Sequence, residues 1–446
     1  LYSPLDSLPR NQRVVLALAM GRTIVMPPEQ EIYLLHARDK HSKNTFSLAD
    51  FFHFESVALE HSGVEIITMK EFLEAEIVTG NIRHPKTGNR LTPPQNRTDW
   101  DGMNPEGKGK ELQQFLQNLT INPLWDTTKC FAVFPAEVGP GKSDALAKSL
   151  EEILSTIPHP DRTGPAVVDN PTPVDSSAKD RMVEMLIDRK QICVYDDAMQ
   201  NQPVVHFGSE ARLLDHFYSV AFFEDYKQDL WTKRFVRDHL RYTDEIQCAA
   251  ARVVHAMREK AIENGNSRGE FDTFHIRRGD FQYTRETRIE AAEIYENSKQ
   301  FLVENSTVYI ATDERNMTFF DPLRKHYKLY FLGDFKEELG IINNNFLGMV
   351  DQRIASRGRV FVGTFYSSFT GYINRMRGYH SQIDSPEAIK TGSQRSYYYA
   401  PKEMAYVIDK YRAMYTPIWA REFPVGWRDL DKGIEEMVMA RKREAQ

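Results

Sequence analysis

The C-terminal half of the chain alternates between short apolar runs and longer amphipathic stretches, and this alternation restricts the fold more than any other feature. The apolar runs have the length of strands and lie at 271–276, 307–311, 329–332 and 359–362. Helix-like periodicity fills the intervals at 286–303, 314–326 and 346–357. Strands that alternate with helices are typical of a parallel sheet covered by helices. The sequence therefore predicts an α/β fold.

Small or polar residues follow each of these predicted strands. The four endings are Arg277-Arg278-Gly279, Thr312-Asp313, Gly333-Asp334 and Gly363-Thr364. In open α/β sheets, ligands bind beyond the carboxyl ends of the strands. We therefore expect a ligand site at this edge of the sheet.

The strongest chemical signal is the segment His275-Ile276-Arg277-Arg278-Gly279-Asp280. A strand here delivers an imidazole and two guanidinium groups into a turn that contains Gly279. The planar fork of arginine makes bidentate, charge-assisted hydrogen bonds with a diphosphate and stays protonated. The alternative interpretation is a surface turn closed by an ion pair between Arg278 and Asp280.

A second signal lies at residues 363–370, which precede a helix-like stretch at 371–377. A strand here runs into the hydroxyl residues Ser367, Ser368 and Thr370 at the start of a helix. Helix N-termini present unbonded N–H groups and the positive end of the helix dipole, and both suit a phosphate. Ser367 or Ser368 could equally serve as a plain N-cap.

Two carboxylates complete this candidate site. Asp313 closes the second strand, where it could bind a ribose hydroxyl or a base edge, or could equally cap the helix that follows. Asp351 lies on the helical stretch before the last strand. Because a helical aspartate is usually solvated, Asp351 alone carries little weight.

Composition and charge exclude several functional classes. Apolar residues make up 41% and charged residues 27% of the 446 residues, as in ordinary soluble domains. The net charge of −6 argues against a nucleic-acid binder, which would be basic. No apolar run reaches about 18 residues, so we expect no transmembrane helix and no membrane contact from this segment. The start at Leu1 is consistent with a trimmed ectodomain.

The N-terminal half has a weaker pattern. Helical stretches are expected at 11–20 and 211–264, and strands at 22–26, 64–68, 130–134, 192–195 and 204–207. The stretches 76–127 and 157–179, rich in Asn, Pro, Gly or Asp, are expected to be long loops. We predict two domains, 1–245 and 246–446, with the last helices of the second packing back on the first.

Cysteines and glycosylation sequons bear on the compartment. Cys130, Cys193 and Cys248 lack the spacing of a zinc site. One disulfide with a free thiol and three buried thiols are both compatible with the sequence. Sequons at Asn96, Asn118, Asn305 and Asn316 favour a secretory compartment, although chance alone produces a few.

Two further motifs suggest other functions. Residues 136–143 fit a relaxed P-loop with Ala136 for the first glycine, and 192–196 resemble a Walker B strand. Pro140 would remove an N–H that a phosphate cradle uses. Asp99 and Asp101 form a DxD that could hold a metal on a nucleotide sugar, but they follow no clear strand. We therefore expect neither a P-loop NTPase nor a metal site.

Three segments together resemble the GDP-fucose protein O-fucosyltransferase family, including its plant-type relatives. They are the stretch from Asn11-Gln12-Arg13 to Pro27-Pro28, the segment His275-Ile276-Arg277-Arg278 and the segment Ser367-Ser368-Phe369-Thr370. They are similar, in order and spacing, to the family's first helix and strand, its HxR segment and its last donor-binding motif. The resemblance is good over 200–380, patchy at the N-terminus and absent in the long loops.

The resemblance implies a GT-B glycosyltransferase, in which two Rossmann-like domains face each other across a cleft. Residues 1–245 would form the acceptor side and 246–446 would bind the nucleotide sugar. The family moves fucose from GDP-fucose to a protein Ser or Thr, and we extend this expectation to glycan acceptors. The reaction is inverting, needs no metal or other cofactor, and is expected in the lumen of the Golgi or the endoplasmic reticulum.

The resemblance also implies roles for individual residues. Arg277 would bind the diphosphate and help the leaving group depart, and Asn11 would lie in the cleft near the donor phosphates. We expect both to be catalytic. The other expected donor-binding residues are His275, Asp313, Asp351, Ser367, Ser368, Phe369 and Thr370.

The sequence departs from the family pattern in ways that leave alternatives open. The stretch from Ser3 to Arg10 stands where family members usually carry a Gly-rich loop, and the family's catalytic Glu has no counterpart, so the general base is open. A rhamnosyl or arabinosyl nucleotide could be the donor, or the chain could be a non-catalytic relative that binds glycans or proteins. The loops and the aromatic run Tyr397-Tyr398-Tyr399 could shape an acceptor site or simply pack.

Overall fold

The structure of the chain is a computed structural model. It describes residues 17, 19–31, 45–54, 57, 65–94, 100, 109–119, 125, 130–156, 176–186, 191–206, 221–283, 288–365, 367–381, 395–400, 424–431, 433 and 434. The chain divides into two compact units, and the main division falls between Thr243 and Asp244.

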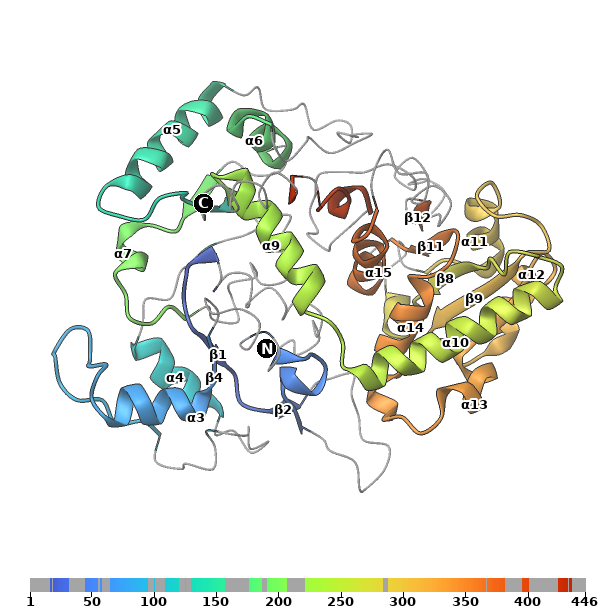
Figure 1. Ribbon diagram of the computed structural model, residues 1–446, viewed down its shortest axis with the longest axis horizontal. Coiled ribbons are helices and arrows are strands. Elements are labelled where there is room, and N and C mark those ends of the chain that lie inside the picture. The colour runs from blue at the N-terminus through green and yellow to red at the C-terminus, as the bar shows by residue number, and fades with distance from the viewer. Residues whose placement is uncertain are drawn as a thin grey trace, which may run out of the picture. The chain divides into compact units, whose positions relative to one another are not determined.

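The second unit contains a parallel sheet, which among the described residues has five strands in the order β10-β9-β8-β11-β12 (Figure 1). These are β8 (Asp272–Ile276), β9 (Thr307–Thr312), β10 (Lys328–Phe331), β11 (Phe361–Thr364) and β12 (Ser396–Tyr399). All neighbouring pairs are parallel. Every residue of β8 and β11 is buried, as expected of strands covered on both faces.

One face of this sheet is covered by α11 (Ala291–Ser298) and α12 (Asp321–Arg324). Phe274 and Ile276 of β8 point to this side, where they join a buried apolar cluster with Ile294 of α11 and Leu323 of α12. Side chains alternate along a strand, so Thr273 and His275 point to the opposite face.

The opposite face is covered by α10 (Asp244–Glu263), α14 (Leu347–Ala355) and α15 (Ser368–Gly378). Helix α10 buries a stripe at helical spacing that packs toward α14: Ile246, Ala250, Val253, Met257 and Ala261. Thr273 of β8 donates a hydrogen bond to the carbonyl of Ala355 at 2.9 Å, which fixes the end of α14 on the sheet.

Short helical turns connect these elements. They are η5 (Gly279–Tyr283), η6 (Met317–Phe320), η7 (Leu332–Phe335), α13 (Lys336–Leu339), η8 (Asn344–Phe346) and η10 (Pro424–Trp427). Of these, η5 follows β8 directly and η6 follows β9, so both begin at the carboxyl edge of the sheet.

The first unit contains a smaller parallel sheet with the order β6-β5-β7. Its strands are β5 (Cys130–Phe134), β6 (Gln191–Val194) and β7 (Ala221–Phe223), and its helices are α5 (Lys142–Thr156), α6 (Ala178–Leu186), α7 (Asp197–Gln200) and α9 (Tyr226–His239). A disulfide between Cys130 and Cys193 links β5 to β6. The sequence left open either one disulfide with a free thiol or three buried thiols. The first is present, because Cys130 and Cys193 are bonded and Cys248 is free and exposed.

The remaining described part of this unit carries two strand pairs. Strand β1 (Ile24–Met26) lies parallel to β4 (Ile66–Thr68), and β2 (Gln30–Glu31) lies antiparallel to β3 (Thr45–Phe46). The helical segments are η1 (Leu48–Asp50), α3 (Met69–Phe72), its π-helical continuation η2 (Leu73–Val78) and α4 (Gly109–Leu119). Helix α3 starts at Thr68, which forms a reciprocal capping box with Glu71.

The α/β class predicted from the sequence is confirmed, and the strands at 130–134 and 271–276 match the prediction almost to the residue. Three expectations are wrong. The helical stretch 211–264 is interrupted by β7, residues 204–206 form no strand, and the expected loop 76–127 contains α4. Among the described residues, no helix is long and apolar enough to span a membrane.

Candidate functional site

The carboxyl edge of the C-terminal sheet brings Arg277 against the end of β11. Strand β8 ends at Ile276, and the backbone N–H of Arg277 donates to Oγ1 of Thr364 at 2.9 Å. The Thr364 hydroxyl also lies 3.1 Å from the carbonyl oxygen of His275 and 2.7 Å from the hydroxyl of Tyr399. Thr364 therefore joins three neighbouring strands at the residue where Arg277 leaves the sheet.

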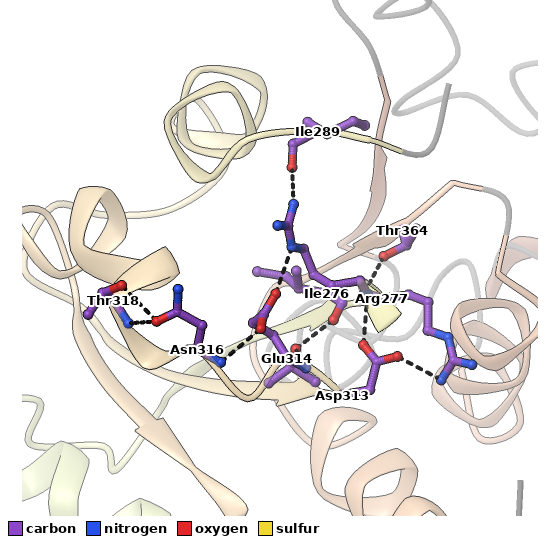
Figure 2. Close-up of polar contacts among 10 residues, drawn as sticks. Ile276, Arg277, Ile289, Asp313, Glu314, Asn316, Thr318 and Thr364 are labelled. Atoms are coloured by element: carbon purple, nitrogen blue, oxygen red, sulfur yellow. Dashed lines mark hydrogen bonds and ion pairs between the residues drawn. The ribbon is translucent and has the colours of Figure 1, made fainter. Parts of the chain in front are cut away.

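The Arg277 side chain lies at the edge of this site and is only partly exposed. Its Nη1 atom lies 3.2 Å from Oδ2 of Asp313, and the side chain is 19% exposed. Its guanidinium also lies over the ring of Phe281, 5.6 Å from the centroid. Figure 2 shows the guanidinium and Asp313 facing each other beyond the strand ends.

The neighbouring Arg278 points to a different place and has a structural role. Its Nε donates to Glu314 at 3.0 Å and its Nη1 donates to the carbonyl of Ile289. Its guanidinium lies 3.8 Å from the centroid of Phe319. The pKa of Glu314 is lowered, first by the backbone N–H of Asn316 and also by Arg278. Arg278 thus ties the turn after β8 to the turn after β9.

Asp313 does not cap the helix that follows it. Its Oδ1 accepts the backbone N–H of Arg278 at 2.7 Å, and its Oδ2 faces Arg277 (Figure 2). A β-carbon on Gly279 would overlap Oδ2, so any larger residue here would have to displace this carboxylate. The glycine of the motif is explained by the close approach of Asp313, because its φ is not in the left-handed region.

His275 is buried inside the layer rather than open to a ligand. Its Nδ1 lies 2.7 Å from Oγ1 of Thr370, and its ring stacks on Phe369 with centroids 4.4 Å apart. Burial lowers the pKa of His275 to about 3, with a smaller contribution from the positive charge of Arg277. The imidazole is therefore neutral at physiological pH and holds the first turn of α15 against β8.

The start of α15 leaves its hydroxyl groups unused for capping. Ser367 occupies the N-cap position but makes no side-chain capping hydrogen bond, although the side chain is buried. Ser367 is therefore the N-cap residue by position, but its hydroxyl does not cap the helix. Gly363 is required beneath this turn, because a β-carbon there would overlap Thr370. The first turn of α15 thus lies at the carboxyl end of β11, next in order to the strand that delivers Arg277.

Asp351 lies between α14 and the sheet rather than on a solvated surface. Its carboxylate accepts a hydrogen bond from the hydroxyl of Tyr309 in the middle of β9. Burial raises the pKa of Asp351 to about 7, and the bond from Tyr309 opposes this shift. Burial raises the pKa of Tyr309 well above its usual value, and the neighbouring Asp351 adds to this shift.

The structure brings most of the expected site residues to one edge. His275, Arg277, Ser367, Ser368, Phe369 and Thr370 belong to β8, the residue after it, and the first turn of α15. Asp313 joins them directly, whereas Asp351 lies further down the sheet against Tyr309. Asn11 lies outside the described residues, as do Asp99 and Asp101.

The P-loop-like segment holds a side chain of this chain where a phosphate would have to lie. The backbone N–H of Gly141 and the hydroxyl of Ser143 both donate to the carboxylate of Asp197, each at 2.6 Å. Lys142 pairs with Glu137. Asp197 of α7 and Glu137 of the loop itself therefore occupy the groups that a phosphate would use. In the part of the chain that the structure describes, no group of three His, Cys, Asp or Glu residues is arranged to hold a metal.

Sequence reasoning missed Thr364 and Tyr399 as parts of this site. The run Tyr397-Tyr398-Tyr399 forms the edge strand β12, in which Tyr398 and Tyr399 are buried. Its run of aromatic residues is typical of a strand and could have revealed β12. No local signal links Tyr399 to Thr364, since that contact depends on the order of strands in the sheet.

Comparison with known proteins identifies the family. The sequence profile described as GDP-fucose protein O-fucosyltransferase matches residues 11–380. The chain belongs to this family. It is a glycosyltransferase, and the family is defined by GDP-fucose as the donor. No curated protein matches the chain in sequence.

Solved structures with similarity to the chain include three of POFUT1. One in complex with GDP has 13% identity and a TM-score of 0.35, covering 82% of this chain and 90% of that chain. Another with GDP has 15% identity and a TM-score of 0.34, covering 87% and 94%. A third, with GDP-fucose, has 12% identity and a TM-score of 0.32, covering 82% and 90%.

Proposed function

We propose that this fucosyltransferase moves fucose from GDP-fucose to a hydroxyl of a protein Ser or Thr or of a glycan, with inversion and without a metal ion. The observation that carries the proposal is the position of Arg277 at the carboxyl edge of β8, beside the N-terminal turn of α15. An arginine and a helix N-terminus at one sheet edge are the groups that a diphosphate needs.

The chemistry of the reaction explains why these groups matter. Breaking the bond between the sugar and the diphosphate builds positive charge on the sugar and negative charge on the leaving phosphate. Preorganised cations and N–H dipoles stabilise that negative charge as it develops. Arg277 would contact the diphosphate, and Ser367, Ser368 and the N–H groups at the start of α15 would hold the GDP.

The other expected residues keep narrower roles in the proposal. His275 and Thr370 support the site from inside, Phe369 lies between His275 and Gly348, and Asp351 would contribute through the helix that Phe369 touches. Asn11 remains a predicted catalytic residue near the donor phosphates.

We also propose that the protein works in the lumen of the secretory pathway, in the Golgi or the endoplasmic reticulum. The disulfide between Cys130 and Cys193 supports an oxidising compartment. Three of the sequon asparagines, Asn118, Asn305 and Asn316, are exposed, and the fourth lies outside the described residues. Exposed sequons are open to N-glycans.

The decisive experiment compares Arg277→Ala with Arg268→Ala, an exposed arginine in the turn before β8. We expect both variants to keep the unfolding midpoint of the parent. Arg277→Ala should lose about a hundredfold in GDP-fucose turnover, equivalent to about 3 kcal/mol, because one charge contact to the leaving group is removed. A well-folded Arg277→Ala with parental turnover would refute the proposal.

A donor panel in EDTA separates the remaining alternatives. Stabilisation by GDP and GDP-fucose without magnesium supports the proposal, and a ligand at about 100 times its Kd adds about 2.7 kcal/mol. Stabilisation by another nucleotide sugar alone, such as a rhamnosyl or arabinosyl donor, would move the donor assignment. No shift from any nucleotide would favour a non-catalytic relative that binds glycans or proteins.

A further inference from the structure

Asp313 contacts two successive residues after β8. One carboxylate oxygen accepts the backbone N–H of Arg278 at 2.7 Å, and the other lies 3.2 Å from Nη1 of Arg277 (Figure 2). The first contact fixes the path of the turn, and the second fixes the direction of the Arg277 side chain. Both contacts come from one residue, which directly follows the neighbouring strand β9.

We propose that Asp313 is a positioning residue for Arg277, and that it acts on the reaction through this arginine rather than by binding the donor. The consequence for catalysis rests on the function proposed above. The orientation of Arg277 by Asp313 is a property of the chain itself and can be measured without any donor.

An arginine at this site requires an orienting partner. The backbone of Arg277 is held by Thr364, and its long side chain extends from there to Asp313 and to the ring of Phe281. Ordering such a side chain costs up to about 2 kcal/mol of conformational entropy. A charged partner that holds the guanidinium in place before the donor binds removes this cost from the reaction. Orientation also matters for the rate, because a small misplacement of a catalytic group lowers it strongly.

The turn is shaped to keep the carboxylate in this place. Gly279 packs directly on Oδ2 of Asp313, where any β-carbon would overlap it. The φ of Gly279 is one that other residues adopt, so the backbone of the turn does not by itself require a glycine. The space left by Gly279 is therefore explained by the need to bring Oδ2 to Arg277.

Charge distinguishes a positioning role from a donor-binding role. A carboxylate beside the guanidinium repels a diphosphate, so Asp313 lowers the affinity for GDP while it improves the orientation of Arg277. Removing its charge should therefore leave GDP affinity unchanged or higher and lower the turnover. A residue that hydrogen-bonds the ribose or the base would give the opposite result, because its loss weakens GDP binding.

The first test measures Asp313→Asn against Asp321→Asn. The control removes the carboxylate of an exposed pair, Asp321 with Arg324, on α12 of the same unit. We expect Asp313→Asn to keep GDP affinity within about twofold or to increase it, and to lower GDP-fucose turnover at saturation by at least about tenfold. A large loss of GDP affinity, or an unchanged turnover, would overturn the proposal.

The second test does not depend on the donor. Phenylglyoxal modifies exposed, unpaired guanidinium groups, and peptide mass spectrometry gives the rate at Arg277. We expect this rate to rise severalfold in Asp313→Asn and to stay at the parental value in Asp321→Asn. An unchanged rate at Arg277 overturns the positioning role. A raised rate in a protein that does not turn over GDP-fucose would reject the proposed function and leave the positioning role intact.

Gly279→Ala provides a second route if Asp313→Asn does not fold. The added methyl group displaces the carboxylate, so this variant should reproduce the faster labelling of Arg277. In an Asp313→Ala background the methyl group meets no carboxylate, and Gly279→Ala should then have no further effect. Additive effects of the two substitutions would contradict the proposed contact.

Discussion

The hydroxyl of Thr370 lies 2.7 Å from Nδ1 of His275, so a buried imidazole joins strand β8 to the first turn of α15. The same imidazole stacks on Phe369, and its backbone carbonyl accepts from Thr364. The residue that begins the HxR segment is therefore buried and supports both halves of the candidate site from inside. Its contribution should be visible in the stability of the protein.

We predict that His275 makes the protein less stable at acidic pH. Burial lowers the pKa of His275 to about 3, whereas in the unfolded chain the value is about 6.5. The unfolded state therefore binds one more proton in this window. The free energy of unfolding should fall as the pH falls below about 6.5, by up to about 1.4 kcal/mol per pH unit.

Urea unfolding of the parent and of His275→Asn between about pH 4.5 and 7.5 measures this contribution. The asparagine amide can replace Nδ1 as a partner of Thr370, but it does not titrate. The variant should therefore have the shallower pH dependence, and the other histidines cancel in the difference. Equal slopes would show that the imidazole is not held neutral.

Gly363→Ala should destabilise the C-terminal unit by about 1–3 kcal/mol. A β-carbon at this position would overlap the side chains of Thr370 and Phe361, and overpacking a close-packed core has costs of this size. Thr370→Ser removes the methyl group that lies nearest and should restore part of the loss.

Gly333→Ala is the matched control for this prediction, because nothing lies within 4 Å of a β-carbon there. Denaturant midpoints of the single and double variants give the coupling between Gly363→Ala and Thr370→Ser. A neutral Gly363→Ala, or losses that simply add, would show that α15 does not pack on β11 at this distance.

Asp351→Asn should stabilise the protein at alkaline pH and not at pH 5. Burial raises the pKa of Asp351 to about 7 in the folded chain, above the usual value of 3.8. The folded state therefore holds a proton that the unfolded state releases, and the contribution of Asp351 to stability is lost as the pH rises through about 7.

An asparagine avoids this loss because it carries no charge at any pH. Between about pH 5 and 8, the stability of Asp351→Asn relative to the parent should rise by roughly 2 kcal/mol, measured without a nucleotide. Asp321→Asn, an exposed carboxylate, should show no such trend. A constant difference across this range would mean that Asp351 is ionised in the folded protein.

Reduction of the disulfide should lower the stability of the first unit. Cys130 and Cys193 are separated by 63 residues, and closing a loop of this length typically stabilises a protein by 2–4 kcal/mol. Cys193→Ser should lower the denaturant midpoint and abolish its response to a reducing agent. Cys248→Ser removes the exposed free thiol and should change neither. A parental midpoint in fully reduced protein would contradict this prediction.

Much of the fold and of the site follows from the sequence, because local patterns carry it. The periodicity of apolar residues predicts the α/β class, and the polar residues after each strand point to the carboxyl edge as the candidate site. Arg277 and the hydroxyl residues at 367–370 are found in this way. The strands β7 and β12 are missed, because a three-residue strand and an aromatic run give no clear period.

The sequence by itself determines which side chains reach the sheet edge, because local residues set where each strand ends. The roles of those groups are decided by contacts between residues far apart in the chain. Asp313 and Glu314 separate Arg277 from Arg278, and α15 buries His275 under Phe369. Two adjacent arginines look alike in a sequence, but two carboxylates that follow the neighbouring strand give them different orientations.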